Sequence, residues 1–471
     1  MRFLHFVHFV AARLRTAHAA RMAVGAPLAV LALACAGAAF AQPYTQIAAG
    51  EYHTCALLDS GGVHCWGDNF RGQLGNGASG NGQESAEALP VQGVVGAVHI
   101  AAGTSHNCAA LASGGVKCWG YNFRGQLGDG STTTRPTAVS VLGVTDAVAV
   151  AAGGDHSCAL RQGGAIKCWG YNGDGELGHG GSEFYLTSAV DVASISTATA
   201  ITARHLHTCA RISDGRAYCW GRNSDGQLGD GSYTSPRRTP VEVSGLSGVT
   251  QLSAGWLHTC AILSAGGVKC WGSNTYDMLG TSNTTSSNVP VNVYASVSNA
   301  LAVAGGEQHS CVVRSLFGVG RIECWGYNGN GRLGYGTVPG TGVVHQAVRV
   351  LGNDAFASVS AGRQHTCALT TGGSAKCWGG NGAGQIGALH YAVGGDDHFA
   401  PQFVAPRCDL DIDGDGTFNA ATDGVLATRA LLGFSGSAVT SGALGAGARR
   451  TTWPAIRNFL LRACGVTGLA P

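Results

Sequence analysis

One stretch of about 50 residues is repeated seven times along this chain, and it limits the possible folds more than any other feature. The first copy, residues 47–77, has the sequence I-A-A-G-E-Y-H-T-C-A-L-L-D-S-G-G-V-H-C-W-G-D-N-F-R-G-Q-L-G-N-G. A histidine marks every copy: His53, His106, His156, His207, His258, His309 and His365. A period of this length is typical of propellers and solenoid arrays.

Each copy contains the parts of a small antiparallel sheet. Two short apolar runs flank Asp59-Ser60-Gly61-Gly62, which predicts a hairpin with a glycine-rich turn. A second turn with one apolar anchor, Leu74, follows, and then a strand marked by proline, as at Pro90. Four short strands per copy, repeated seven times, predict an all-β fold: a seven-bladed β-propeller over residues 42–406.

Fourteen of the 17 cysteines form one pair per repeat. In a hairpin closed around Ser60, Cys55 and Cys65 are directly opposite, at a separation that suits a disulfide. The expected disulfides are Cys55 with Cys65, Cys108 with Cys118, Cys158 with Cys168, Cys209 with Cys219, Cys260 with Cys270, Cys311 with Cys324, Cys367 with Cys377 and, around the C-terminal segment, Cys408 with Cys464. The alternative is metal binding, in which His53, Cys55 and Cys65 would supply three zinc ligands, although no fourth ligand recurs.

The repeat, A-G-x-x-H-[TS]-C-A-L…G-x-[VI]-x-C-W-G-x-N…G-Q-L-G-x-G, resembles those of the regulator of chromosome condensation family over residues 47–404. The resemblance implies a closed seven-bladed propeller. Both cysteine positions depart from the usual family pattern, which has Leu or Ser there more often. The chain therefore looks like a disulfide-stapled, exported version of a cytoplasmic or nuclear design.

The repeated side chains favour structural roles, because a catalytic histidine is needed once and not seven times. We expect the seven histidines to tie a strand to a neighbouring turn by hydrogen bonds, and the tryptophan after each second cysteine to pack between blades. Function should then depend on places where the repeat is irregular. These places are residues 78–88, 182–187 with Glu183, Phe184 and Tyr185, 233–238, 274–278, 316–321, and 388–399 with His390, Asp396, Asp397 and His398.

Residues 1–41 have the pattern of an export signal, with a basic lead, an apolar run over residues 26–40 and a small-x-small site at Ala39-Phe40-Ala41. We therefore expect a secreted, periplasmic or cell-surface protein with no membrane span in the mature chain. The alternatives are an uncleaved membrane anchor over residues 22–41 and a lipoprotein attached through Cys35.

A different signal begins after Pro406, and residues 407–471 form a separate unit. Acidic residues at alternate positions followed by a glycine match the start of a calcium loop and resemble dockerin-like modules. The expected Ca²⁺ ligands are Asp411, Asp413, Asp415, Thr417, Asn419 and, one residue later than usual, Asp423. Two helices, at residues 422–432 and 454–463, should follow. An acidic turn without metal is the alternative.

Charged residues make up 12% of the chain and the formal net charge is +2, which argues against nucleic acid as a partner. We expect a monomeric, non-enzymatic binding module that engages a protein or a glycan. The alternatives are a lyase or hydrolase with a site on one propeller face, first sought at His390, Asp396 and His398, or an inhibitor of an extracytoplasmic enzyme.

Overall fold

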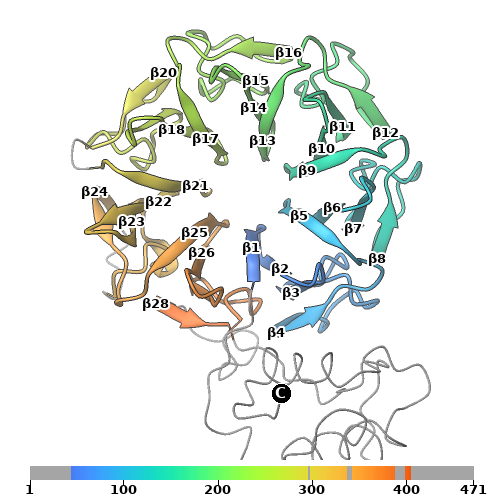
Figure 1. The fold of residues 1–471 in the computed structure, drawn as a ribbon, viewed down its shortest axis with the longest axis horizontal. Helices are drawn as coiled ribbons and strands as arrows, with labels where there is room; N and C mark the ends of the chain where they lie inside the picture. The colour runs from blue at the N-terminus through green and yellow to red at the C-terminus, as the bar shows by residue number, and fades with distance from the viewer. Residues whose placement is uncertain (1–43, 295–296, 337–341, 388–397, 405–471) are drawn as a thin grey trace, which may run out of the picture. The chain divides into compact units, whose positions relative to one another are not determined.

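Each copy of the repeat folds into one four-stranded antiparallel sheet, and seven such sheets stand around a common axis in the computed structural model (Figure 1). The structure describes residues 44–294, 297–336, 342–387 and 398–404. Within every sheet the strands follow chain order, from the innermost strand beside the axis to the outermost strand at the rim. The seven-bladed propeller predicted from the repeat is therefore confirmed.

The strands of blades 1 to 4 are β1 (Tyr44–Ala49), β2 (His53–Leu58), β3 (Val63–Gly67), β4 (Ser85–Pro90), β5 (Ala97–Ala102), β6 (His106–Leu111), β7 (Val116–Gly120), β8 (Arg135–Ser140), β9 (Ala147–Ala152), β10 (His156–Arg161), β11 (Ile166–Tyr171), β12 (Tyr185–Asp191), β13 (Ala198–Arg204), β14 (His207–Ile212), β15 (Ala217–Gly221) and β16 (Arg237–Glu242). Those of blades 5 to 7 are β17 (Val249–Ala254), β18 (His258–Leu263), β19 (Val268–Gly272), β20 (Ser287–Asn292), β21 (Ala300–Gly305), β22 (His309–Leu316), β23 (Val319–Tyr327), β24 (Val343–Arg349), β25 (Phe356–Ala361), β26 (His365–Thr370), β27 (Ala375–Gly379) and β28 (His398–Phe403). A short 3-10 turn, η1 (Gly329–Gly331), follows β23.

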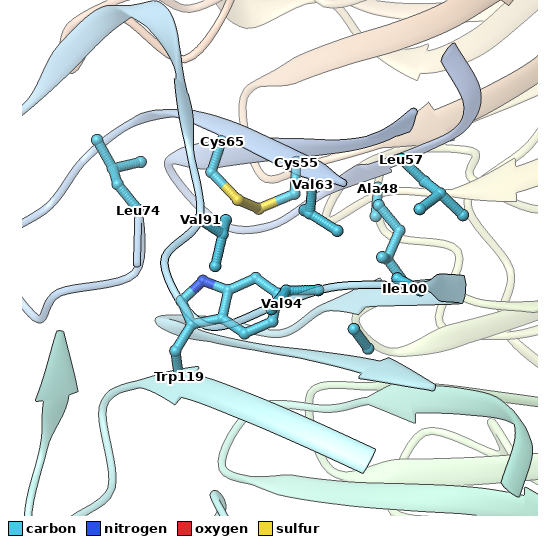
Figure 2. Close-up of a cluster of buried hydrophobic side chains, with 12 residues drawn as sticks. Ala48, Cys55, Leu57, Val63, Cys65, Leu74, Val91, Val94, Ile100 and Trp119 are labelled. Atoms are coloured by element: carbon cyan, nitrogen blue, oxygen red, sulfur yellow. A yellow bond between two sulfur atoms is a disulfide. The ribbon is translucent and has the colours of Figure 1, made fainter. Parts of the chain in front are cut away.

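The core lies between blades, in seven similar clusters. In the first junction, the Cys55 and Cys65 side chains of blade 1 pack with Leu74 and Val91 against Trp119 of blade 2 (Figure 2). Trp119 is fully buried, as is the equivalent tryptophan of each other blade. The predicted inter-blade role of the tryptophans is confirmed, and the face of the sheet that carries the cysteines forms the other half of each junction.

The paired cysteines of each blade lie opposite one another in register, as the hairpin geometry predicted. Cys55 pairs with Cys65 across β2 and β3, with a Cα–Cα separation of 4.1 Å. In all seven expected pairs of the repeats the sulfur atoms lie 2.04–2.12 Å apart, which is disulfide distance. The other six pairs are Cys108 with Cys118, Cys158 with Cys168, Cys209 with Cys219, Cys260 with Cys270, Cys311 with Cys324, and Cys367 with Cys377.

The zinc alternative has no support in the part of the chain that the structure describes. Among those residues, no group of three His, Cys, Asp or Glu side chains is arranged to hold a metal ion. His53, the third ligand that this alternative required, instead places its Nε2 atom 2.8 Å from the side-chain oxygen of Asn107. Cys65 lies at disulfide distance from Cys55 and needs no metal to account for its position.

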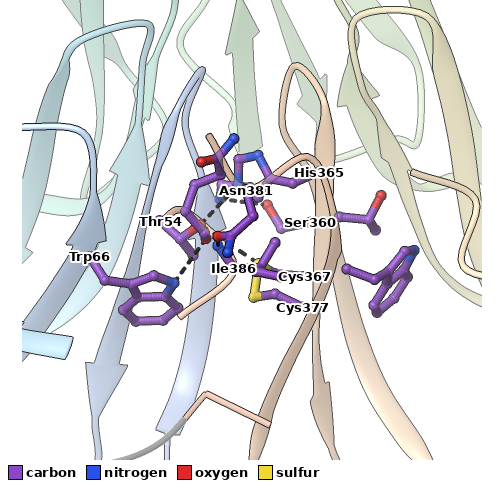
Figure 3. The surroundings of a disulfide bond; sticks show 12 residues. Thr54, Trp66, Ser360, His365, Cys367, Cys377, Asn381 and Ile386 are labelled. Carbon is purple, nitrogen blue, oxygen red and sulfur yellow. Dashed lines mark hydrogen bonds between the residues drawn. A yellow bond between two sulfur atoms is a disulfide. The ribbon is translucent and has the colours of Figure 1, made fainter. Parts of the chain in front are cut away.

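The ring closes without sharing a strand between its ends, because β1 opens blade 1 and β28 completes blade 7. At this junction the His365 Nε2 atom lies 2.9 Å from the Thr54 hydroxyl, and the Trp66 indole donates to the carbonyl of Gln385 at 3.0 Å (Figure 3). Ser360 accepts a hydrogen bond from the Ala49 amide at 2.9 Å. Side-chain packing and hydrogen bonds therefore close the propeller in the same way as they join the other blades.

Candidate binding face

The two ends of the ring carry different connections. In blade 1, residues 50–52 link β1 to β2 and residues 68–84 link β3 to β4, and the Asp68 amide donates to the Tyr52 carbonyl at 2.9 Å. We call the end formed by these turns and their equivalents the loop face. The β2–β3 turn at residues 59–62 lies at the other end, with its equivalents, and we call this end the hairpin face.

A network of hydrogen bonds under the loop face accounts for the repeated histidines. Each histidine Nε2 lies 2.8–2.9 Å from the side-chain oxygen of the Thr, Ser or Asn that follows the histidine of the next blade: His53–Asn107, His106–Ser157, His156–Thr208, His207–Thr259, His258–Ser310, His309–Thr366 and His365–Thr54. The second residue in turn donates to a backbone carbonyl of the preceding blade, as Ser157 does to Gln126 at 2.9 Å. The histidines therefore tie blade to blade, and not strand to turn as the sequence suggested.

One residue per blade, two positions before the repeated histidine, lies near the axis on the loop face. These residues are Glu51, Thr104, Gly154, His205, Trp256, Glu307 and Arg363. Unlike the histidine, cysteine and tryptophan positions, this position changes chemical character from blade to blade. It is therefore free of the packing requirement that keeps the rest of the motif uniform.

Arg363 holds two of these side chains together. It forms ion pairs with Glu51 and with Glu307, whose carboxylate lies 3.0 Å from the arginine Nε atom. Burial raises the pKa of Glu51 above its ordinary value, although the Arg363 charge opposes the rise. The guanidinium group also lies over the rings of Tyr52 and Trp256, with distances of 5.2 and 5.9 Å to their centroids.

Trp256 connects this ionic cluster to blade 4. Its indole stacks on the imidazole of His205, with ring centroids 4.1 Å apart and planes inclined by 21°. Burial lowers the pKa of His205 to about 4, so the stacked imidazole is neutral at physiological pH. The cavity beside the stack, lined by Glu51, Thr104 and Arg204 among others, measures only about 10 Å³, which is room for roughly one water molecule.

Blade 4 departs from the repeat at the preceding position, because Arg204 stands where the other blades have glycine. In blade 1 a Cβ on Gly50 would come within 2.2 Å of the His53 ring, which explains the glycine. Blade 4 avoids this clash by extending β13 to Arg204, which pairs with His207, while His205 takes a left-handed conformation with φ of 45°.

Arg204 reaches across the axis. Its Nη1 atom donates to the carbonyl of Ala49 in blade 1 at 3.0 Å, and burial lowers its pKa to about 10. The side chain lies where the central channel, a cavity of about 230 Å³ lined by all seven innermost strands, meets the loop face. Polar side chains in this channel bridge neighbouring strands, as Gln251 does by accepting a hydrogen bond from the Val303 amide at 3.0 Å.

Farther from the axis, the loop face of blades 1 to 3 carries a row of aromatic and arginine side chains. This aromatic–arginine band consists of Phe70, Arg71, Tyr121, Phe123, Arg124, Tyr171 and Phe184. Phe70, Phe123 and Phe184 are 47%, 67% and 51% exposed. Exposed phenylalanines linked through arginine and tyrosine side chains into one row are unusual on a protein surface that has no partner.

The irregular places singled out from the sequence have mixed roles. Phe184 belongs to the band, whereas Glu183 pairs with His179 at 3.0 Å. Asp277 is buried and accepts hydrogen bonds from Tyr294 and His345. The segment 233–238 contains Arg237, which pairs with Asp230 at 2.7 Å, and the 316–321 tip lies on the hairpin face with Phe317 fully exposed. Segment 388–399 lies almost wholly outside the described residues.

Several predicted sites also fall outside them. The calcium ligands Asp411, Asp413, Asp415, Thr417, Asn419 and Asp423, the pair of Cys408 and Cys464, the candidate residues His390 and Asp396, and the export signal of residues 1–41 all lie there. Each of these stays a prediction. No helix of the described residues is long and apolar enough to cross a membrane.

Sequence reasoning missed the residues at the ring centre. The sequence does mark one of them, because Arg204 replaces a glycine found at the equivalent position of every other copy. The variable position of the motif, with Glu51, Trp256, Glu307 and Arg363, could also have been separated from the constant ones. What sequence could not show is that these residues, up to 312 positions apart, meet at one end of the axis.

The seven four-stranded blades, the inter-blade tryptophans and the variable loop face define a propeller of the repeat type, in which a constant scaffold presents changing side chains. A family model described as an RCC1-like domain matches residues 26–344, and regulator of chromosome condensation (RCC1) repeats match residues 320–369 and 356–385. The chain belongs to this family.

Its relatives include the ultraviolet-B receptor UVR8 of Arabidopsis thaliana, 29% identical over 72% of this chain and 66% of the receptor. A probable human E3 ubiquitin-protein ligase, HERC6, is 28% identical over 62% of this chain, which covers 24% of the ligase. Among solved structures, Prp20p of Saccharomyces cerevisiae superimposes with a TM-score of 0.64 at 20% identity, covering 77% of this chain and 89% of Prp20p. Human WBSCR16 gives a TM-score of 0.61 at 21% identity, covering 74% and 95% of the two chains. The solved structures support the fold alone.

Proposed function

We propose that this chain is a binding module whose loop face engages a protein partner. The observation that carries the proposal is the contrast between constant and variable positions. Histidine, cysteine and tryptophan recur because they join the blades, whereas the position of Glu51, Trp256 and Arg363 differs in every neighbouring blade and faces the loop end. A uniform scaffold with one variable face is the usual arrangement of a repeat protein that recognises other molecules.

The chemistry of the face favours a protein over a small molecule. At its centre two acidic groups, Glu51 and Glu307, offset two basic groups, Arg204 and Arg363. The cavity lined by Glu51 and Arg204 has space for little more than a water molecule. Mixed charges beside aromatic rings are common at protein interfaces, where tyrosine, tryptophan and arginine supply much of the affinity.

The family supports a role in interaction. The reported properties of Prp20p include binding to Gsp1p and to histones, and a structure of it bound to Kap60 has been solved. These partners are those of Prp20p. For this chain we expect only that a propeller of the same family acts by binding a protein.

We further propose that the protein works outside the cytoplasm with one cross-link in each blade. The cysteine pairs at disulfide distance support this, because disulfides persist in oxidising compartments. The pattern of residues 1–41 supports export independently.

The test is capture of a partner from the native extracellular fraction with the intact oxidised protein. Trp256→Ala combined with Glu307→Gln should abolish capture, whereas Phe317→Ser, on the exposed tip of the hairpin face, should leave it unchanged. Loss of capture with Phe317→Ser alone would move the binding site to the other face. Turnover of a glycan or peptide by the intact protein would instead favour the enzymatic alternative.

A further inference from the structure

We propose that the aromatic–arginine band of blades 1 to 3 is a docking site for an acidic, extended segment of the partner polypeptide. This inference rests on the proposed binding function and names the partner chemistry and the part of the loop face that recognises it. It is carried by two arginines that lie over aromatic rings and form no ion pair with a carboxylate among the described residues.

The two guanidinium groups are held against aromatic rings of the following blade. The Arg71 guanidinium carbon lies 4.6 Å from the centroid of Tyr121 and 5.0 Å from that of Phe70. The Arg124 guanidinium carbon lies 5.6 Å from the centroid of Tyr171 and 4.7 Å from that of Phe184. Stacking of this kind holds the planar group in place while its N–H edges still point away from the rings.

Neither guanidinium group makes a side-chain hydrogen bond or an ion pair with any residue that the structure describes. Other arginines of the propeller are paired, for example Arg161 with Asp146 at 2.7 Å and Arg314 with Glu323 at 2.8 Å. A fixed guanidinium group with free N–H edges is suited to two parallel hydrogen bonds with a carboxylate.

Of the seven side chains in the band, two are cationic and none is acidic. Asp155 is the acidic neighbour that both arginines influence: burial raises the pKa of its carboxyl, and Arg124 and Arg71 oppose the rise. This carboxyl already accepts a hydrogen bond from the Gln126 amide at 2.9 Å. Asp174 also lies close enough to add to the rise that burial causes in the pKa of Tyr171, but neither guanidinium group is paired with a carboxylate among the described residues, which favours a partner that brings its own acidic groups.

The aromatic rings are better placed to contact amino-acid side chains than to stack on sugars or nucleobases. Tyr121 and Phe123 stack on each other with centroids 6.1 Å apart, and Tyr171 meets Phe184 edge to face at 5.0 Å. Guanidinium groups or other rings thus cover part of the ring faces on which a sugar or base would stack. Two free arginines are also few for a phosphate polymer, which is usually bound along a longer basic stripe.

The experiment measures binding of a fluorescein-labelled peptide of alternating glutamate and tyrosine to the intact oxidised protein by fluorescence anisotropy. Arg71→Gln combined with Arg124→Gln should weaken binding by at least roughly tenfold, because each change removes a charge-assisted contact. Arg216→Gln, which removes an exposed arginine from the hairpin face, is the matched control and should change affinity less than about twofold. Phe123→Ala should also weaken binding, and thermal unfolding of each variant verifies that it is folded.

Three results would overturn the inference. The first is equal binding of the matching peptide of glutamine and tyrosine, and the second is unchanged affinity in the double arginine variant. The third is preferential binding of alginate or of single-stranded poly-thymidine, which would make the band a glycan or nucleic-acid site. If the double variant still captures the native partner while Trp256→Ala with Glu307→Gln does not, the proposed function stands and only this inference fails.

Discussion

The guanidinium group of Arg204, on blade 4, donates a hydrogen bond at 3.0 Å to the carbonyl oxygen of Ala49, on blade 1. These two blades are not neighbours in the ring, so the contact crosses the central channel where it meets the loop face. The histidine and tryptophan contacts that join neighbouring blades recur around the ring, whereas this one has no counterpart because the equivalent residue of each other blade is glycine.

Replacing Arg204 by methionine should therefore destabilise the propeller. Methionine fills similar space but leaves the Ala49 carbonyl without this donor and removes a positive charge near Glu51 and Glu307. We expect a loss of about 1–3 kcal/mol in the free energy of unfolding, measured by urea denaturation of the oxidised protein. Arg216→Met is the control for a charge change at an exposed site. An unchanged or higher stability would show that the desolvation of the arginine offsets its contacts.

The histidine network predicts that the fold is sensitive to acid. Burial lowers the pKa of His258 from 6.5 to about 3, and that of His106 likewise. An unfolded histidine takes up its proton near pH 6.5, so the unfolded state binds more protons between pH 6.5 and 3, and stability falls as the pH falls through this range. At pH 5 each such histidine should account for about 2 kcal/mol of lost stability.

The measurement is urea unfolding between pH 7 and 5. His258→Gln should remove up to one proton from the difference in proton uptake between the unfolded and folded states. The slope of the unfolding free energy against pH should then fall by up to about 1.4 kcal/mol per pH unit. The comparison outside the ring network is His345→Gln, because the His345 side chain is half-exposed and contacts the Asp277 carboxylate. Equal slopes for the wild type and the His258 variant would contradict a neutral buried network.

Glu176 predicts the opposite pH dependence. It occupies a position that is glutamine in four other blades, and burial raises its pKa from 4.5 to about 8. One oxygen accepts a hydrogen bond from the Asp174 amide at 2.9 Å, and the other has no partner among the described residues. The folded state therefore holds a proton that the unfolded state loses between pH 4.5 and 8, and stability should fall by about 1.4 kcal/mol per unit as the pH rises through this range.

Glu176→Gln should remove this penalty, so the variant should exceed the wild type in stability at pH 8 by a few kcal/mol and match it near pH 4.5. Gln227 offers the reverse experiment, because its side chain accepts a hydrogen bond from the Asp225 amide and its NH₂ group lacks a partner among the described residues. Gln227→Glu should introduce the same loss at alkaline pH. If neither change alters the pH profile, the Glu176 carboxyl is ionised in the folded protein.

Much of the fold could be predicted from the sequence because each level of the repeat agrees with the next. The hairpin turn at Ser60 places Cys55 opposite Cys65, and alternation along the strand then turns Trp66 toward the preceding blade. These relationships are local and recur in all seven copies, so the prediction made for one hairpin can be checked against the sequences of the other six. The hydrogen-bond partner of each histidine was not predicted, because His53 meets Asn107 only when two blades are placed side by side.

The candidate face could be predicted only in part. Phe184 stood out because it lies in an irregular loop, but Phe70 and Phe123 lie inside regular turns and their exposure depends on how the blades are arranged. The cluster of Arg363 with Glu51 and Glu307 joins three blades around the axis. No spacing rule for one strand or turn predicts a meeting of this kind, since it depends on closure of the whole ring.

The cysteine geometry predicts seven bonds within blades. Peptide mapping of the unreduced mature protein should recover pairs such as Cys55 with Cys65, and a free-thiol count on the unfolded protein should find the fourteen repeat cysteines unreactive. Replacing both cysteines of one pair by valine should cost roughly 2–3 kcal/mol, measured as a shift in urea unfolding, because the open chain regains conformational freedom. Bonds between blades, or fourteen reactive thiols, would contradict the cross-linked hairpin.

The C-terminal loop supports a last prediction, which concerns calcium. Asp411, Asp413 and Asp415 alternate before Gly416, a spacing that lets carboxylates converge on a hard cation while the glycine permits the turn. Isothermal titration calorimetry on the intact chain should show binding of one Ca²⁺, and Asp413→Asn should weaken it by more than about tenfold because it removes a charged ligand. Asp423→Asn tests whether the closing ligand lies one residue later than usual, and Asp225→Asn, on the propeller, is the control. Unchanged calcium binding in both loop variants, or none in the wild type, would leave these residues as an acidic turn without metal.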